Sequence, residues 1–331
     1  MRTVFKSALV GFGGLAVGGG FLWLALRQFD GQQFAQILAS FEVRYMLAAG
    51  GFYWLGMAIR CSRWQALLLQ LRTLSWCSVA EVLVVGYGAN NLLPARLGEF
   101  VRAEVAKKRF GLSRSMLLGT ILVERALDLL VVLGCLLGGI ALGAATTDSS
   151  FAPAIKQIVI HGLVLILLIG LAVKLLSGRL RATRSLARLR IVREFLSGIS
   201  SLNARSASLA CALSSLVWVC ESCALWLTFK ALHLELNVAQ TMLLVGAASL
   251  STLLPTAPGY IGSYQLVFVL AMGAFGIPET AGIVASIAIQ LFLFGTVTVV
   301  ALGLFFARFL LDWKQQIRPT PVLQQQEIAH G

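Results

Sequence analysis

Arginine and glutamate side chains recur at a spacing of three residues in the stretch NNLLPARLGEFVRAE, residues 90–104. Arg96, Glu99 and Arg102 would share one face of a helix that follows Pro94. Guanidinium groups bind phosphate through paired hydrogen bonds, and a neighbouring carboxylate can hold the arginines or compete for them. The stretch is therefore a candidate site for an anionic group.

A second charged cluster lies in the stretch VERALDLL, where Glu124 and Asp128 are four residues apart and Arg125 precedes Asp128 by three. These residues would lie roughly 12–18 Å along their helix, near mid-bilayer if that helix spans a membrane. A charge at this depth costs at least about 2.5–3.5 kcal/mol, so it should be paired or face a water-filled cavity. We expect the two clusters to meet, for example Arg125 with Glu99 and Arg96 with Asp128. A purely structural ion network is the alternative, and the two roles do not exclude each other.

Glu221 is a further acidic residue inside an apolar stretch, where it could pair with an arginine or take up a proton. The sequence has no His/Cys set with metal-ligand spacing, no phosphate-binding glycine loop and no G-x-S-x-G nucleophile motif. We therefore expect neither a metal nor a cofactor.

The composition places these charged residues in a membrane protein. The 331 residues are 58% hydrophobic and 12% charged, with a mean hydropathy of +0.85, whereas soluble domains are about 25% charged. Apolar runs near 20 residues recur along the chain, and each is long enough to cross a bilayer as a helix. The fold class is thus an all-α polytopic membrane protein with about six full transmembrane helices. We expect these helices near residues 7–26, 45–62, 116–144, 155–176, 209–229 and 279–307.

The net charge of +13 does not indicate nucleic-acid binding, because the basic residues fall in loops between apolar runs. By the positive-inside rule, the arginine-rich loop 177–208 and the loop 60–77 are cytoplasmic, and 145–154 lies outside. Both termini are then cytoplasmic. Residues 1–310 would form one integral membrane domain, and 311–331 a polar cytoplasmic tail that we expect to be disordered.

Two further apolar stretches are too short to be ordinary spans. The orientation of the flanking loops requires residues 78–115 and 239–278 each to leave and regain the same side of the membrane. The first limb of the earlier segment has about 15 residues, or about 23 Å of helix, short of the ~30 Å hydrocarbon core. Both segments are therefore predicted to be re-entrant helical hairpins, although a pair of ordinary spans would also satisfy the orientation.

The two hairpins resemble each other in sequence. Each first limb ends in Leu-Leu-Pro, at Pro94 and Pro255, and Gly98 and Gly259 follow. Three spans separate the hairpins, so the copies would be inserted from opposite faces as an inverted pseudo-repeat, a pattern that points to a transport site at the midplane. Broken backbone at membrane depth needs partners, which the amides of the turn could supply. The expected turn residues are Asn90, Asn91, Pro94, Gly98, Pro255, Pro258, Gly259 and Gly262; for the prolines and glycines, a purely structural role is the alternative.

These motifs, together with LLPTAPGYIGSYQ near the end, resemble the bacterial lysylphosphatidylglycerol synthase transmembrane family, which includes the flippase-like membrane half of multiple peptide resistance factors. The resemblance covers most of the chain and implies movement of a phospholipid or polyprenyl-linked lipid between leaflets. The family usually has a glutamate where this chain has Gln265, and often an arginine near Gln290. No aminoacyl-transferase domain is present, so this chain should not make the aminoacyl lipid itself. The residues implied by the resemblance are Asn91, Pro94, Arg96, Gly98, Glu99, Arg102, Glu124, Arg125, Asp128, Pro258, Gly259 and Gly262.

The leading hypothesis is a flippase or scramblase for an anionic phospholipid or polyprenyl-linked lipid in the bacterial plasma membrane. One alternative is a membrane-embedded transferase acting on a lipid-linked sugar or amino acid, with Glu99, Glu124 or Asp128 as base. The other is a non-catalytic partner of a glycosyltransferase or lipid synthase. The expected partners are membrane lipids and a lipid-modifying enzyme, and the sequence is compatible with an oligomer.

Overall fold

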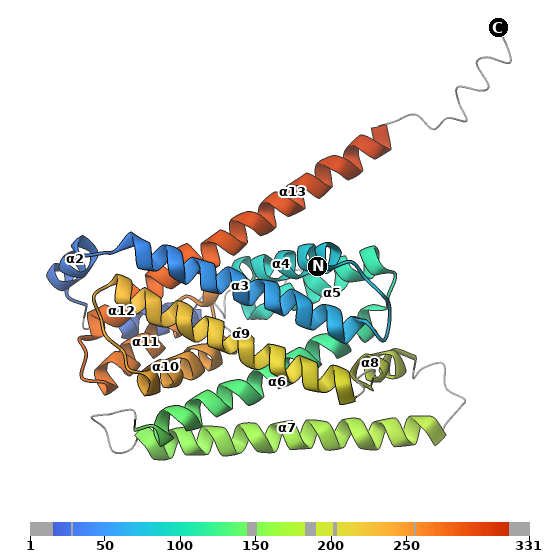
Figure 1. Ribbon diagram of the computed structural model, residues 1–331, viewed down its shortest axis with the longest axis horizontal. Coiled ribbons are helices and arrows are strands. Elements are labelled where there is room, and N and C mark those ends of the chain that lie inside the picture. Colours follow the sequence, from blue (N-terminus) through green and yellow to red (C-terminus); the bar gives the residue numbers. More distant parts are fainter. Residues whose placement is uncertain are drawn as a thin grey trace, which may run out of the picture.

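The computed structural model describes residues 16–27, 29–143, 151–182, 190–200, 204–254 and 256–317. All regular secondary structure in these ranges is helical, which confirms the all-α class (Figure 1). Pro255 and the start of the first expected helix lie outside the described residues. The expected disordered tail, 311–331, is wrong in its first part because residues 311–317 continue the last helix, and the rest of it lies outside the described residues. A short helix, Ala16–Leu26, and α2, Gly31–Ala39, precede the two halves of the fold.

The first half consists of two long helices on either side of a broken hairpin. Its elements are α3 (Val43–Leu68), α4 (Trp76–Leu92), the 3-10 turn η1 (Pro94–Arg96), α5 (Gly98–Phe110) and α6 (Arg114–Ala141). Serine caps start both α4 and α6, since the hydroxyls of Ser75 and Ser113 accept from backbone N–H groups three residues on. Gly111, at φ 65°, ends α5 in the left-handed region.

The second half repeats this order with one elaboration. Its elements are α9 (Ala204–Ala231), α10 (Val238–Ser251), η3 (Pro258–Tyr260), α11 (Ser263–Ala274), α12 (Glu279–Ala288), the π-helix η4 (Ile289–Phe294) and α13 (Gly295–Ile317). Asn237 and Gln240 form a reciprocal capping box at the start of α10. Gly276, at φ 72°, follows α11 as Gly111 follows α5.

The two halves pack together through three pairs of helices: α3 with α9, α6 with α10, and α13 with α4 (Figure 1). Helices α3 and α9 are antiparallel: the Glu42 N–H donates to the Ala231 carbonyl (2.8 Å) at one end, and Arg63 Nη1 donates to Ser214 Oγ (2.8 Å) toward the other. Helix α6 packs on α10, and α13 packs on α4. The helix that follows each hairpin thus packs against the first limb of the other hairpin.

The two turns share two backbone features, although they differ at Gly259 and Gly262, which have positive φ only in the second turn. In η1 and η3 a proline begins the turn, Arg96 (φ 54°) and Tyr260 (φ 64°) have positive φ, and the next helix starts two or three residues later. Pro94 is therefore equivalent to Pro258, so the match through Leu-Leu-Pro, which pairs Pro94 with Pro255, is displaced by three residues. The chain needs the extra residues because α10 ends at Ser251, well before its turn.

Gly98 and Gly262 begin the second limbs for different steric reasons. A Cβ at Gly98 would overlap the backbone of Gly86 and Asn90, so this glycine lets α5 pack closely against α4. Gly262 has φ 95°, and a Cβ there would overlap the backbone of Gly18. Gly98 is thus required by close backbone packing, and Gly262 by close packing together with its positive φ.

Helices α7 (Phe151–Ala182) and α8 (Arg190–Ser200) connect the halves. Only 6% of the apolar stretch of α7 is buried, and the helix lies along one edge of the molecule (Figure 1). Helix α8 corrects the expectation of a continuous loop over 177–208. It packs on α6, where Ser115 Oγ donates to Glu194 (2.8 Å). Arg190 Nε also donates to Glu194 Oε1 (2.8 Å). Both hydrogen bonds lower the pKa of Glu194, and the one from Arg190 has the larger effect.

Within the described ranges, three segments are long and apolar enough to cross a membrane: Ala152–Leu176, Arg205–Ala231 and Glu279–Arg308. They coincide with three of the six expected spans. Helices α3 and α6 have sufficient length, about 39 and 42 Å at the helical rise, but they contain charged residues. The expected loop at 60–77 is wrong in its first part, because α3 continues to Leu68 and buries Arg60 and Arg63.

Candidate functional site

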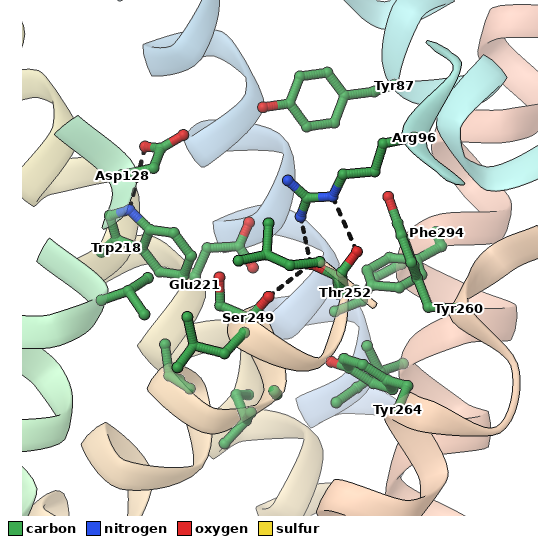
Figure 2. Close-up of a pocket in the computed structure, with 18 of the residues that line it drawn as sticks. Tyr87, Arg96, Asp128, Trp218, Glu221, Ser249, Thr252, Tyr260, Tyr264 and Phe294 are labelled. Carbon is green, nitrogen blue, oxygen red and sulfur yellow. Dashed lines mark hydrogen bonds between the residues drawn. The ribbon is translucent and has the colours of Figure 1, made fainter. Parts of the chain in front are cut away.

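A cavity of about 370 Å³ lies where the two hairpin turns meet helices α3, α6 and α9. Figure 2 shows its side chains converging from both halves of the fold, with Arg96 extending into the centre between Tyr87 and Tyr260. The charged residues that line it are Arg60, Arg96, Glu99, Arg125, Asp128 and Glu221. Its apolar wall is formed largely by α6 and α10, with Leu129, Val132, Val245, Leu250 and Leu253 among its residues. The cavity is therefore amphipathic.

The turn η1 reaches across to the second hairpin through Arg96. Arg96 Nε donates to the Thr252 carbonyl (3.0 Å), and its Nη2 donates to the Thr252 hydroxyl. Its guanidinium carbon lies 6.0 Å from the ring centroid of Tyr260, and Nη1 is 4.0 Å from Glu99. The expected pairing of Arg96 with Asp128 is thus replaced by contacts with the second hairpin.

Arg125 joins α6 to the first hairpin as expected. Its Nε lies 3.4 Å from Glu99 Oε1, its Nη1 lies 3.5 Å from Asp128 Oδ2, and its Nη2 donates to the Tyr87 hydroxyl (3.1 Å). Asp128 also accepts from the indole N–H of Trp218 (3.3 Å; Figure 2). Glu99, Arg125 and Asp128 therefore face the cavity as one connected set.

Behind the cavity wall lies a fully buried charged network. Arg63, which has no exposed surface, is 2.5 Å from Asp128 Oδ1 and 3.2 Å from Glu124 Oε1. The other oxygen of Glu124 lies 2.8 Å from Arg102 Nη2, and the Arg102 guanidinium stacks 3.6 Å above the Trp64 ring. Arg102 and Glu124 belong to the predicted set but do not line the cavity; they hold Arg63 and Asp128 in place.

Glu221 of α9 is ion-paired. Its Oε1 lies 2.7 Å from Arg60 Nη2, and both residues line the cavity. Of the two roles considered for Glu221, the structure contains the pairing with an arginine. That arginine comes from α3, which packs along α9.

The amides of the turn contact different groups from those expected. Asn91 Nδ2 donates to the Phe294 carbonyl and the Thr298 hydroxyl, both at 3.0 Å, and so binds the other half of the protein rather than its own turn. Asn90 is buried against Gly98, and its Oδ1 has no hydrogen-bond partner among the described residues. Asn91 is therefore a link between the halves.

The two positions that depart from the family resemblance contact each other. Gln265 Nε2 donates to Gln290 Oε1, and Gln290 Nε2 donates to the Gly259 carbonyl (2.9 Å). Gln265 Oε1 also accepts from the Gly262 N–H (2.8 Å). A neutral amide pair thus supports the η3 turn, and no charge from these positions enters the cavity.

Sequence reasoning missed several residues of the site, above all Arg60 and Arg63. The sequence analysis assigned both arginines to a cytoplasmic loop, although the apolar run resumes directly after Arg63 as WQALLL. This resumption is the signal that α3 continues through the arginines. The aromatic and hydroxyl groups of Tyr87, Trp218 and Thr252 carry no comparable signal, because similar residues occur throughout apolar helices.

The helical fold, its apolar segments and the charged cavity between two broken hairpins define a polytopic helical membrane protein. More specifically, the chain belongs to the family of the lysylphosphatidylglycerol synthase transmembrane region, whose profile matches residues 11–303. This finding confirms the family indicated by the sequence motifs, and with the apolar helices it indicates a membrane location.

Two relatives are archaeal rather than bacterial. The chain is 28% identical over 222 residues to a UPF0104 membrane protein of Methanocaldococcus jannaschii, a match that covers 61% of this chain and 90% of the relative. It is also 28% identical over 249 residues to a UPF0104 membrane protein of Methanothermobacter thermautotrophicus, with 67% and 71% covered.

Proposed function

We propose that this protein moves a lipid with an anionic headgroup between the leaflets of the plasma membrane. The observation that carries the proposal is the amphipathic cavity at the meeting point of the two hairpin turns, with Arg60, Arg96 and Arg125 in its wall. Guanidinium groups match phosphate oxygens, and the apolar wall of α6 and α10 suits the first carbons of the lipid tails. Headgroup and tail are thereby served by one cavity.

The symmetry of the fold supports transport rather than static binding. Helix α6, which follows the first hairpin, packs on α10 of the second, and α13, which follows the second hairpin, packs on α4 of the first. This reciprocal packing relates the two hairpins. On this proposal the hairpins are re-entrant, enter from opposite faces and open the cavity alternately to each leaflet. Both termini then lie in the cytoplasm, and residues 1–310 act as one membrane domain.

The transferase alternative has less support because the cavity carboxylates are occupied. Glu99 lies near Arg125, Asp128 near Arg63 and Glu221 near Arg60, each in an ion pair. A general base must be free to accept a proton from the substrate, whereas each of these carboxylates already contacts an arginine. These groups are better suited to holding the arginines until a substrate arrives.

The decisive experiment is leaflet exchange in vesicles. Purified protein is reconstituted with fluorescent phosphatidylglycerol, and a membrane-impermeant quencher reports the fraction exposed over time. Protein-containing vesicles should expose the inner-leaflet probe, and empty vesicles should not. Exchange equal to that of empty vesicles for phosphatidylglycerol and for a polyprenyl-phosphate lipid refutes the proposal.

The insertion of the first hairpin is tested separately by thiol labelling. In a background without native cysteines, a cysteine at Leu97, which is exposed at the η1 turn, should react with a membrane-impermeant maleimide far more slowly than one at Lys107 near the end of α5. Equal, rapid labelling at both positions would place the turn in an aqueous loop and remove the basis for a re-entrant hairpin.

A further inference from the structure

Arg60 is the cavity arginine with the most unused hydrogen-bonding capacity. It is 7% exposed, and its Nη2 faces Glu221 at 2.7 Å. Its Nε and Nη1 are buried and have no hydrogen-bond partner among the described residues. The Tyr87 ring, 5.5 Å from the guanidinium carbon, flanks it without accepting those N–H groups. Buried hydrogen-bond donors are normally paired, so two unpaired donors on a residue that lines the cavity point to a ligand.

The other two cavity arginines are already engaged by protein acceptors. Arg96 donates to both oxygens of Thr252, and Arg125 donates to the Tyr87 hydroxyl and lies beside two carboxylates. A ligand must displace these contacts to bind there, whereas binding to Arg60 breaks no hydrogen bond of Nε or Nη1 and requires only that these buried atoms turn toward the cavity that the residue lines. Arg60 is therefore the candidate for the first phosphate contact.

The charge of the whole cluster limits what the ligand can be. Five arginines face four carboxylates, which leaves a single positive charge. The arginines are Arg60, Arg63, Arg96, Arg102 and Arg125, and the carboxylates are Glu99, Glu124, Asp128 and Glu221. A ligand with one negative charge neutralises the cluster, whereas a ligand with two leaves an excess negative charge beside the carboxylates. Uncompensated charge at this depth is costly.

We propose that the cavity selects lipids whose phosphate is a diester with one negative charge, and that Arg60 binds this phosphate with Glu221 as its resting counter-ion. This inference rests on the proposed function and narrows its substrate class. Phosphate diesters occur in glycerophospholipids and in prenyl phosphosugars. Phosphate monoesters, which carry about −1.5 to −2 charges at pH 7, and diphosphates are disfavoured.

Competition binding tests this selectivity on the full-length protein in neutral detergent. Fluorescent phosphatidylglycerol is displaced by unlabelled phosphatidylglycerol, undecaprenyl phosphoglucose or undecaprenyl diphosphate. At least one diester should displace the probe at a concentration at least tenfold lower than the diphosphate, and the stronger of the two diesters identifies the source. A diphosphate that competes as well as both diesters overturns the inference.

Charge-changing variants test the assignment of Arg60 and Glu221. Glu221→Gln raises the cluster charge by one. The ratio of the diphosphate concentration to the diester concentration needed to displace the probe should therefore fall at least tenfold. Arg60→Gln should weaken diester binding at least tenfold. Glu104→Gln, which removes a carboxylate paired with Arg114 at an exposed position outside the cavity, is the matched control and should leave the ratio unchanged.

The ratio of two competitors is measured on the same folded protein, so a loss of yield does not alter it. A Glu221→Gln ratio equal to that of the unmodified protein overturns the role of cluster charge. The proposed function fails in a different way, by an absence of lipid exchange in vesicles, and binding selectivity is measured independently of that exchange.

Discussion

Replacing Arg63 with methionine should strongly destabilise the protein, because this arginine has no exposed surface and joins two carboxylates. Its Nη1 lies 2.5 Å from Asp128 and its Nη2 3.2 Å from Glu124, and Nη1 also donates to Ser214 of α9. Methionine fills a similar volume but supplies no donor. Among the described residues, Asp128 then keeps the more distant Arg125 as its ion-pair partner together with the Trp218 N–H, and Glu124 keeps Arg102 as its ion-pair partner.

The expected loss is about 3–5 kcal/mol, the usual effect of removing one member of a buried pair. It corresponds to about a hundredfold to several-thousandfold change in the unfolding equilibrium. Arg114→Met breaks the pair with Glu104, in which the side chains are 54% and 35% exposed. An exposed pair contributes about 0–1 kcal/mol, so this variant is the matched control.

Unfolding in mixed micelles with increasing dodecyl sulfate, followed by tryptophan fluorescence, measures the difference. Trp64, the residue after Arg63, is fully buried and reports directly on the network. The double variant Arg63→Met with Asp128→Asn should recover about 0.5–3 kcal/mol relative to the sum of the single changes. If Arg63→Met and Arg114→Met unfold within 1 kcal/mol of each other, residue 63 is not a buried ion-pair partner and α3 does not extend as described.

Three further predictions concern the turn, α8 and the cavity. Gly262→Ala should destabilise the protein by about 1–3 kcal/mol, because φ is 95° and the added Cβ overlaps Gly18; the same unfolding assay measures it. Arg190 lowers the pKa of Glu194, so the contact of α8 with α6 should persist above the usual glutamate pKa and loosen as the pH falls below it. The ratio of pepsin cleavage within α8 of the unmodified protein to cleavage of Glu194→Gln at the same pH should then rise as the pH falls, since the protease's own pH dependence cancels in that ratio. Arg125→Lys keeps the charge but loses the planar fork, and lipid exchange per folded molecule should fall about tenfold; full activity would contradict phosphate binding by this residue.

Much of the site was accessible from the sequence because polar residues in apolar segments are costly and therefore informative. The spacing of Glu124 and Asp128 placed them on one helix face, and Arg125 meets Glu99 as anticipated. The broken limbs followed from short apolar stretches ending near proline. Such reasoning identifies which residues must find partners.

The sequence failed where one observation has two physical explanations. Positive charge marks cytoplasmic loops, but the same residue type stabilises buried carboxylates, and Arg60 and Arg63 belong to the second case. The sequence alignment through Leu-Leu-Pro matched the ends of the first limbs of the two hairpins. The conserved geometry lies in the turn itself, in a proline followed two residues later by a positive φ. Backbone dihedral angles of this kind leave little trace when the residues are Arg96 and Tyr260.

The π-helix η4 fixes the rotational phase of α13. A π-turn contains one residue more than an α-turn, so every side chain after Phe294 is rotated by about 100° from its position in an uninterrupted α-helix. Asn91 donates to the carbonyl of Phe294, the last residue of η4, and to the hydroxyl of Thr298 near the start of α13. Deleting Leu291, which is 74% exposed, would remove the extra residue and turn Thr298 away from Asn91. Insertions or deletions in η4, more than substitutions, therefore rotate the face of α13 that packs on the first hairpin.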